Sequence, residues 1–457
     1  MAEFRFNVLL PDGKTAVYRY DNADSTLFLE GRRVVVEGGR VKRESPELLS
    51  ARIEGRKLKE QLRVLRIKLG LSCNYACAYC LQAKTDAESG LTPRDVDALV
   101  EKIQTAICCG GDDARPLRIE FWGGEPFVYW AALKPLAEKL RVLYPKAVFL
   151  LITNASLLDD EKIDWLDALG FGVGVSHDGP GQFVRGKDPF DDERTRAAIL
   201  TLYARLAPQG RLSFNPVIHR GNGRRKHVVA YFDALFPGDE HLRFGEGRLV
   251  SPTNAAGLRL CFTAREHVAY RRAEYLSMLR DEQVWRFYFL HHVVNAFLDS
   301  LETETKASEI GTSCVADGAD SVSIDREGKV LLCNNVADAD FDARGRRLRF
   351  GNLSNLDAVR VDTRRFLYRQ KGSTCFSCPV LHICHGTCPI EDDPRFQRAA
   401  CDNAFSDSVL GLAYAIRELS GGGLLTRIDG EGLTEERRDI FGLQETGDRK
   451  RETGDRG

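Results

Sequence analysis

From residue 62 to residue 250 the chain alternates short apolar runs with amphipathic stretches of helical period. The apolar runs predict strands at 64–71, 117–122, 147–153, 172–176, 212–218 and 241–244. The stretches between them predict helices at 93–108, 131–143, 159–169 and 194–206. Strands that alternate with helices form parallel sheets covered by helices. Six such units predict an α/β fold, built as a partial (β/α)6 TIM-like barrel or as an open sheet.

The first 61 residues predict a small, separate module of β-strands. Alternating apolar and polar residues mark strands at 6–10, 16–20, 26–30 and 33–37, with turn-forming Asp, Asn and Gly residues between them. After the barrel-like region 62–250, residues 251–310 predict a helical bridge, with long helices at about 262–282 and 283–306.

The C-terminal part divides into a cysteine-dense segment and a tail. Residues 311–405 contain a predicted hairpin, 321–325 and 329–333, and we expect the rest to be irregular up to Cys401 and to fold around metal. Residues 406–457 start with a predicted helix at 408–419. They end in a charged, repeated stretch, 445–449 and 452–456, which we expect to be disordered.

Length and charge limit the possible functions. A chain of 457 residues is long enough for two or three domains. Its 65 basic and 66 acidic residues nearly cancel, so no overall field attracts nucleic acid or an anionic membrane. The first residues lack the apolar core of a signal peptide, and no apolar run reaches about 18 residues. We therefore expect a soluble, cytoplasmic protein without nucleic-acid or membrane partners.

Thirteen cysteines are a large number for a chain expected in the cytoplasm. The cytosol keeps thiols reduced, so metal ligation explains clustered cysteines better than a disulfide framework does. We interpret Cys108, Cys109 and Cys261, which belong to no cluster with ligand spacing, as small buried apolar residues.

Three cysteines, Cys73, Cys77 and Cys80, directly follow the first strand of the barrel-like region. A cubane iron-sulfur cluster held by three thiolates leaves one iron open to a further ligand. Three residues separate the first pair and two the second, with the aromatic Tyr79 before the last cysteine. This arrangement resembles the cluster loop of the radical S-adenosylmethionine enzymes. The alternative for this loop is a zinc knuckle or a set of buried thiols.

That resemblance implies that Cys73, Cys77 and Cys80 hold a 4Fe-4S cluster whose open iron binds S-adenosyl-L-methionine (SAM). It also implies an oxidoreductase activity. An electron from a low-potential donor such as flavodoxin or ferredoxin would release a 5'-deoxyadenosyl radical, which abstracts hydrogen from the substrate.

Further motifs lie at or near the ends of the later strands. Gly123, Gly124, Glu125 and Pro126 follow the second strand and resemble the Gly-Gly-Glu-Pro motif of the same family, which implies that they hold the methionyl ammonium of SAM. Glycine there lets the backbone approach closely. Barrel folds place their active sites at this edge of the sheet.

The fourth strand is followed by three weaker candidates. The resemblance implies that Ser176 and Asp178 contact the ribose or the carboxylate of SAM, and that Arg185 helps at the carboxylate. His177 stands where the family usually has an apolar residue. It is either a substrate contact or a tolerated variation, and we favour the second interpretation.

Seven cysteines of the C-terminal third have the spacing of the SPASM domain, an extension of this family that carries two auxiliary 4Fe-4S clusters. The resemblance therefore implies three clusters in all. It assigns Cys314, Cys333 and Cys388 to the first auxiliary cluster and Cys375, Cys378, Cys384 and Cys401 to the second.

The first auxiliary set has one ligand too few. Relatives often supply a cysteine shortly upstream of Cys314, but residues 305–312 contain none, which predicts an open iron or a remote ligand such as Cys261. A structural zinc scaffold is the competing, non-enzymatic interpretation. Seven cysteines do not divide into sets of four, and the segment has no concentrated basic and aromatic surface.

Enzymes that pair these two domains mostly modify peptides or proteins. The resemblance favours a maturase of ribosomally made precursor peptides (a RiPP maturase) that installs a carbon-carbon or thioether crosslink. Formylglycine formation, as in sulfatase maturation, is the alternative, but Asn334 stands where those relatives have an Asp that acts as a base. Residues 1–61 would either bind a leader peptide by strand addition or cap the barrel.

Overall fold

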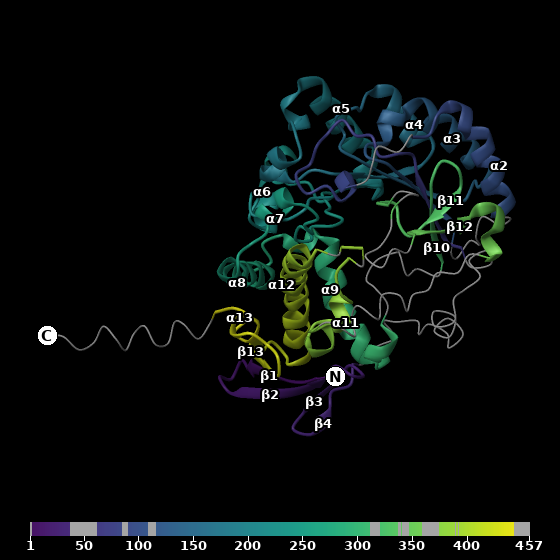
Figure 1. Ribbon diagram of the computed structural model, residues 1–457. Coiled ribbons are helices and arrows are strands. Elements are labelled where there is room, and N and C mark those ends of the chain that lie inside the picture. Colours follow the sequence, from purple (N-terminus) through teal and green to yellow (C-terminus); the bar gives the residue numbers. More distant parts are fainter. Residues whose placement is uncertain are drawn as a thin grey trace.

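The computed structural model describes residues 2–36, 62–84, 90–107, 116–310, 320–336, 340, 347–358, 374–388, 390–391 and 393–442. A curved layer of strands and helices forms one end of the molecule, a small antiparallel sheet forms the other, and long helices connect the two (Figure 1). Cys314, Cys108, Cys109 and the repeated tail 445–456 lie outside the described residues.

The larger sheet contains the parallel strands that the sequence predicts. In the described residues its order is β12-β11-β10-β5-β6-β7-β8-β9, and β5 to β9 run parallel. The five strands are β5 (Val64–Lys68), β6 (Arg118–Trp122), β7 (Val148–Thr153), β8 (Phe171–Val175) and β9 (Leu212–Phe214). The predicted α/β class is confirmed.

The sixth predicted strand, 241–244, was wrong as a regular element. Phe244 makes only isolated parallel bridges, to Phe214 on one side and Phe287 on the other. Its neighbours Glu240, His241 and Arg243 are polar, and the apolar Leu242 and Phe244 are too few to sustain a ladder.

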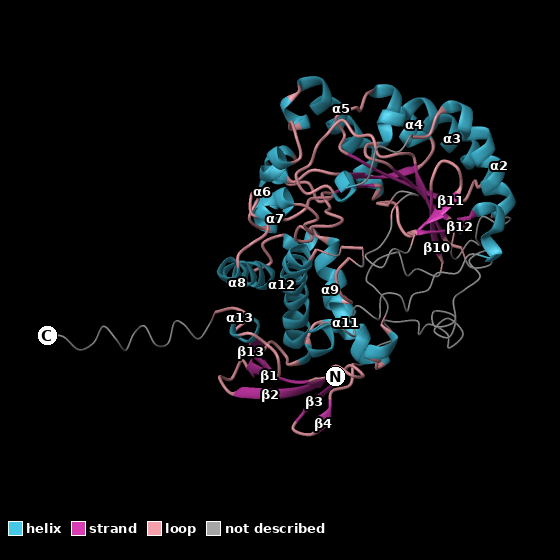
Figure 2. Ribbon diagram, in the orientation of Figure 1, coloured by secondary structure: helices cyan, strands magenta, loops and turns pink. Residues whose placement is uncertain are grey.

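Helices cover the outer side of these strands, as Figure 2 shows. They are α2 (Val96–Ala106), α3 (Trp130–Leu143), α4 (Asp160–Ala168), α5 (Glu193–Leu206) and α6 (Arg225–Leu235). Aspartate side chains cap the N-termini of two of these helices. Asp159 accepts a hydrogen bond from Lys162 N at 3.0 Å at the start of α4, and Asp192 accepts one from Thr195 N at 2.9 Å at the start of α5. The first four helices match the predicted ranges within a few residues, and α6 was not anticipated.

The predicted hairpin of the cysteine-dense segment is present and extends the same sheet. It consists of β10 (Ser321–Ile324) and β11 (Lys329–Leu331), followed by the antiparallel β12 (Arg349–Asn352). β10 pairs in parallel with β5, so this segment lies beside the strand that leads into the three-cysteine loop.

The helical bridge is also present, and it packs against a helix longer than predicted. Its elements are α7 (Ala255–Arg259), α8 (Ala264–Leu279) and α9 (Tyr288–Thr303). The short α11 (Leu381–Cys384) precedes α12 (Pro394–Leu419), which includes Cys401. The expectation of an irregular chain up to Cys401 was wrong, because Asp393 caps a helix that starts at Pro394.

The small sheet combines both ends of the described chain. Its order is β13 (Leu424–Gly430), β1 (Glu3–Leu9), β2 (Thr15–Asp21), β3 (Thr26–Leu29) and β4 (Arg32–Arg33). This terminal sheet packs against α9, where Tyr20 meets Phe297 at 5.4 Å between ring centroids. The short α13 (Glu435–Arg438) follows it. The expectation of a cap over the barrel was wrong, because the sheet lies beside α9 and α12 (Figure 1).

No helix within the described ranges combines the length and the apolar character needed to cross a bilayer.

Candidate functional site

The loop that carries the first three cysteines leaves β5 through a tight passage. Gly70 has a φ of +150°, and a Cβ there would lie 2.4 Å from the hydroxyl of Tyr129. The same hydroxyl accepts a hydrogen bond from Ser72 N at 2.7 Å. Tyr129 therefore fixes the start of the cluster loop, which we define as residues 69–80.

The three thiols of the cluster loop influence one another. Burial raises the pKa of Cys77 to about 11, with Cys80 and Cys73 adding to the effect and Arg185 opposing it. Burial also raises the pKa of Cys73, whose sulfur accepts from Tyr75 N at 3.3 Å. Thiols grouped in this way stay protonated until a metal supplies positive charge. Three adjacent thiols, of which Cys73 and Cys77 have a raised pKa, fit a 4Fe-4S cluster with one open iron.

In the described part of the chain, no three His, Cys, Asp or Glu side chains converge closely enough to hold a single metal ion. A cubane cluster binds its thiolates at separate corners. The expectation that the cluster loop holds a 4Fe-4S cluster therefore rests on the chemistry of its three thiols and not on the geometry of a single-metal site.

The Gly-Gly-Glu-Pro segment lies directly against the cluster loop. Gly124 N donates to Gly70 O and Glu125 N donates to Ser72 O, both at 3.0 Å. A Cβ on Gly124 would lie 2.4 Å from Ser72 O and 2.5 Å from Leu71 O. Only glycine lets the two backbones approach this closely.

The carboxylate of Glu125 is buried and held by three hydrogen bonds. It is 1% exposed and accepts hydrogen bonds from Thr153 Oγ1 at 2.7 Å, from Asn154 N at 2.7 Å and from Phe127 N at 3.2 Å. Burial raises its pKa, and these three hydrogen bonds oppose that effect. The implied contact of this carboxylate with the methionyl ammonium stays a prediction. Here the side chain ties the end of β6 to the end of β7.

Replacing Gly124 with alanine is expected to lower SAM cleavage by about 10- to 100-fold, because overpacking costs about 1–3 kcal/mol at the backbone of the cluster loop. Gly123→Ala is the matched control, since the atom nearest to a Cβ there is Gly70 O at 3.2 Å and a small adjustment accommodates it. The measurement is the rate of 5'-deoxyadenosine release by the two variants. Equal rates would show that the loops do not need this close contact.

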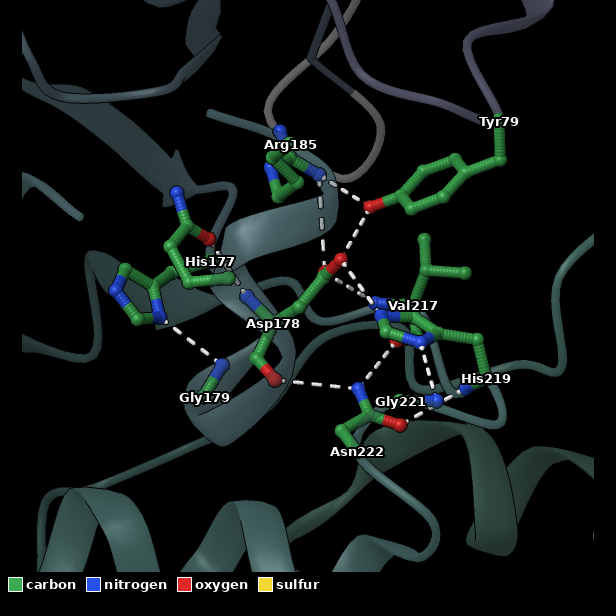
Figure 3. A network of polar contacts seen from close by, with 10 residues as sticks. Tyr79, His177, Asp178, Gly179, Arg185, Val217, His219, Gly221 and Asn222 are labelled. Carbon is green, nitrogen blue, oxygen red and sulfur yellow. Dashed lines mark hydrogen bonds and ion pairs between the residues drawn. The ribbon is translucent and has the colours of Figure 1, made fainter. Parts of the chain in front are cut away.

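A buried network joins the cluster loop to the segment after β8 (Figure 3). Tyr79, which lies between Cys77 and Cys80, donates to Asp178 Oδ2 at 2.5 Å. Arg185 Nη1 donates to the Tyr79 hydroxyl at 2.7 Å and lies 3.7 Å from Asp178 Oδ1.

Asp178 is the centre of this network and is 0% exposed. Val217 N donates to Oδ1 at 2.9 Å, and His219 Nε2 lies 3.3 Å from Oδ2. Burial opposes ionisation of Asp178, but His219, Arg185 and Tyr79 outweigh it and lower the pKa. Protein groups enclose this carboxylate, and its implied contact with the ribose or carboxylate of SAM stays a prediction.

Arg185 is the member of the network that faces the cysteines. Its charge opposes the rise in the pKa of Cys73 and of Cys77, and its buried Nε has no hydrogen-bond partner among the described residues. A guanidinium held in this way can receive a carboxylate. Ser176 is half-buried beside the network, and its backbone N donates to Thr153 O at 2.8 Å.

His177 is fully buried. Its Nδ1 accepts from Gly179 N at 3.0 Å, so Nε2 carries the proton and donates to Asp188 Oδ1 at 3.0 Å. The ring also stacks on Tyr231. This environment agrees with the interpretation of His177 as a tolerated variation.

Comparisons with known proteins agree with these observations. No family model matches the chain. The radical SAM cyclopropyl synthase TigE of Paramaledivibacter caminithermalis is 20% identical over 366 residues, which cover 72% of this chain and 68% of TigE. The chain is a radical S-adenosylmethionine enzyme.

Solved structures share the fold of this radical SAM enzyme. Native anSMEcpe with bound AdoMet (SAM) gives a TM-score of 0.56 at 17% identity, covering 78% of this chain and 99% of that chain. The structure of anSMEcpe with AdoMet and the Cp18Cys peptide gives the same TM-score, identity and coverage.

The four cysteines assigned to the second auxiliary cluster of this radical SAM enzyme lie close together. Burial raises the pKa of Cys378 to about 12; Cys401 and Cys375 add to the effect, and Arg437 opposes it. Burial raises the pKa of Cys384 further, again with contributions from the other three thiols. Four thiols grouped in this way fit the donor set of a closed 4Fe-4S cluster, and their assignment as its ligands stays a prediction.

The first auxiliary set is described only in part. Cys333 and Ile390, which is two residues after Cys388, pack against the same small apolar cluster, so both cysteines lie in one neighbourhood. Cys261, the remote alternative ligand, is buried, and its sulfur accepts from Asn403 Nδ2 at 3.5 Å. These contacts agree with the interpretation of Cys261 as a core residue.

Sequence reasoning missed three residues of the radical SAM enzyme that contact these sites. The Tyr79 hydroxyl binds Asp178, Arg437 Nη2 lies 3.3 Å from Cys401 Sγ, and Asn22 Nδ2 donates to the carbonyl oxygens of Phe376 and Cys378 at 3.0 and 3.2 Å. Of the three, only Tyr79 could have been found from the sequence, because it lies within the cysteine motif. The other two come from chain segments far from their partners in sequence.

Proposed function

We propose that this radical SAM enzyme is a cytoplasmic maturase that abstracts hydrogen from a ribosomally made peptide and installs a carbon-carbon or thioether crosslink. The observation that carries the proposal is the cluster loop, where three grouped thiols lie beside Arg185. A low-potential protein such as flavodoxin or ferredoxin would deliver the electron.

The residues of the chain have separate parts in this proposal. Cys73, Cys77 and Cys80 would hold the 4Fe-4S cluster, and Arg185 would orient the carboxylate of SAM. When bound, the cluster supplies the electron that splits the sulfonium of SAM and frees a 5'-deoxyadenosyl radical. Asp178 and Tyr79 hold the guanidinium in place, so that it is preorganised before the cofactor binds.

A cavity of about 640 Å³ next to the cluster loop supports a substrate of peptide size. Tyr75, between two of the cysteines, belongs to its wall together with the apolar Phe127, Trp130 and Leu158. Lys187 and Arg194 line it as well. A fold shared with anSMEcpe, which has been solved with a bound peptide, favours the same substrate class.

Formylglycine formation is less well supported. The position after Cys333 holds Asn334, an amide without a basic oxygen, and its Nδ2 donates to Asn335 Oδ1 at 3.1 Å. Lys68 lies near this segment and donates to Val336 O at 2.7 Å. An ammonium group engaged in that way does not replace a carboxylate base.

The test is anaerobic reconstitution of the full chain with iron and sulfide. We expect about twelve irons per chain, the content of three cubane clusters, and release of 5'-deoxyadenosine from SAM under a low-potential reductant. An iron content near four atoms per chain would mean that only one cluster forms, and the assignment of two auxiliary clusters would be rejected. If zinc copurifies with the protein and SAM is not cleaved, the interpretation as a structural zinc scaffold would replace the interpretation as an enzyme.

The substrate class is tested by adding short peptides encoded next to this gene and following their mass. Crosslinking predicts a loss of two hydrogens per modification, together with new fragments that span the joined residues. Conversion of a cysteine-containing sulfatase peptide to formylglycine would favour the alternative.

A further inference from the structure

The C-terminal segment folds back onto the second auxiliary cysteine set and places one arginine against a ligand. Arg437 of α13 donates from Nη2 to Cys401 Sγ at 3.3 Å and to Asp402 Oδ1 at 2.8 Å. Its guanidinium also lies over the ring of Phe405, at 4.7 Å from the centroid. Three partners on one helix, α12, fix this side chain.

A second arginine anchors the backbone around Arg437. Arg271 of α8 is 3% exposed and donates to Glu436 O at 2.6 Å, to Ile440 O at 2.8 Å and to Ser406 Oγ at 3.1 Å. Phe441 stacks on Tyr275 at 4.6 Å. The segment 435–441 is therefore part of the packed structure, and the position of Arg437 does not depend on the contact with sulfur.

Charge near a ligand sulfur changes the electron affinity of an iron-sulfur cluster. Hydrogen bonds to the sulfurs and the net charge of the site set its reduction potential, and reduction adds one negative charge. An arginine stays protonated in proteins, so its N–H groups and its positive charge both favour the reduced state.

We propose that Arg437 is a positioning residue that raises the reduction potential of the auxiliary cluster held by Cys375, Cys378, Cys384 and Cys401. This inference rests on the proposed function, because it needs a cluster at these cysteines. Its effect is that a low-potential donor, oxidised by one electron, reduces this cluster more completely at a given potential. The C-terminal segment thereby contributes to the redox chemistry without supplying a ligand.

The experiment isolates this one cluster in the full chain. The background variant carries alanine at the other described ligand positions, Cys73, Cys77, Cys80, Cys333 and Cys388. In that background Arg437→Met is compared with the unaltered Arg437 by redox titration followed with electron paramagnetic resonance. We expect the ratio of reduced to oxidised cluster at a fixed potential to fall about tenfold, which for one electron is a shift of about 59 mV to more negative potential. Arg437→Lys keeps the charge and should shift less.

The matched control is Arg438→Met, one residue along, because Arg438 donates to Gly430 O at 3.2 Å and to no cysteine that the structure describes. Its titration should coincide with that of the background. Iron content near four per chain in all variants shows that the cluster forms. With that iron present, an unchanged potential in Arg437→Met would overturn the inference and leave the proposed function standing. If the background variant contains no iron, both the assignment of a cluster to these four cysteines and the inference about Arg437 would be rejected.

Discussion

Replacing Cys73, Cys77 and Cys80 together with alanine is expected to lower release of 5'-deoxyadenosine from SAM by at least about 1,000-fold, to the level of the uncatalysed reaction. The physical reason is that alanine has no electron pair for iron, so no open iron is present to bind SAM and pass an electron to it. The measurement is chromatographic quantification of 5'-deoxyadenosine under reductant. Iron should fall by about four per chain, because the auxiliary cysteines are untouched.

The control for this variant is Cys261→Ala. Cys261 is buried, its sulfur donates to Gly257 O at 3.6 Å, and its partner Asn403 also donates to Val250 O. A core cysteine of this kind should leave iron content and cleavage unchanged. Cleavage that persists in the triple variant would move the site away from the cluster loop. A loss of iron in Cys261→Ala would make this residue the missing ligand of the first auxiliary cluster.

The parts of the fold that depend on local patterns were predictable. β5 to β8 and helices α2 to α5 lie close to the ranges expected from apolar periodicity, and the hairpin around Gly328 is where its turn residues predict it. The resemblance to the SPASM domain assigned Cys375, Cys378, Cys384 and Cys401 to one cluster, and the structure places these thiols near enough to contribute to the raised pKa of Cys378 and of Cys384.

The parts that depend on contacts between distant segments were not predictable. β13 follows more than four hundred residues after β1, and nothing in either strand specifies the other as a partner. The parallel pairing of β10 with β5 is of the same kind. Asp178 was chosen for its place after a strand, but its burial by Tyr79, Val217 and His219 depends on three other segments.

The terminal sheet illustrates what the sequence alone leaves open. Asn22 is 0% exposed and binds the carbonyl oxygens of Phe376 and Cys378, while Arg437 reaches Cys401 from the segment after β13. Both ends of the described chain therefore contact the second auxiliary site. The N-terminal strands, which appear separate in sequence, therefore contact the segment that carries Cys378.

Arg225→Met is expected to lower the free energy of unfolding by about 3–5 kcal/mol, the cost of leaving buried carboxylates without their cation. Arg225 of α6 is 0% exposed and donates to Glu274 Oε2 at 2.7 Å on α8 and to Asp407 Oδ1 at 2.8 Å on α12. Its Nη1 also donates to the Tyr270 hydroxyl at 2.8 Å. This ion network joins the helices of the barrel to the bridge and to α12. The measurement is urea denaturation under anaerobic conditions, followed by tryptophan fluorescence.

A surface ion pair provides the comparison for this network. Arg220 binds Glu266 at 2.6 Å, but the two side chains are 48% and 37% exposed, so Arg220→Met should cost less than about 1 kcal/mol. Adding Glu274→Gln to Arg225→Met removes one unpaired charge and should restore part of the loss. Equal effects of Arg225→Met and Arg220→Met would mean that the buried network adds nothing beyond a solvated pair. The attachment of α6 to α8 and α12 would then rest on apolar packing alone.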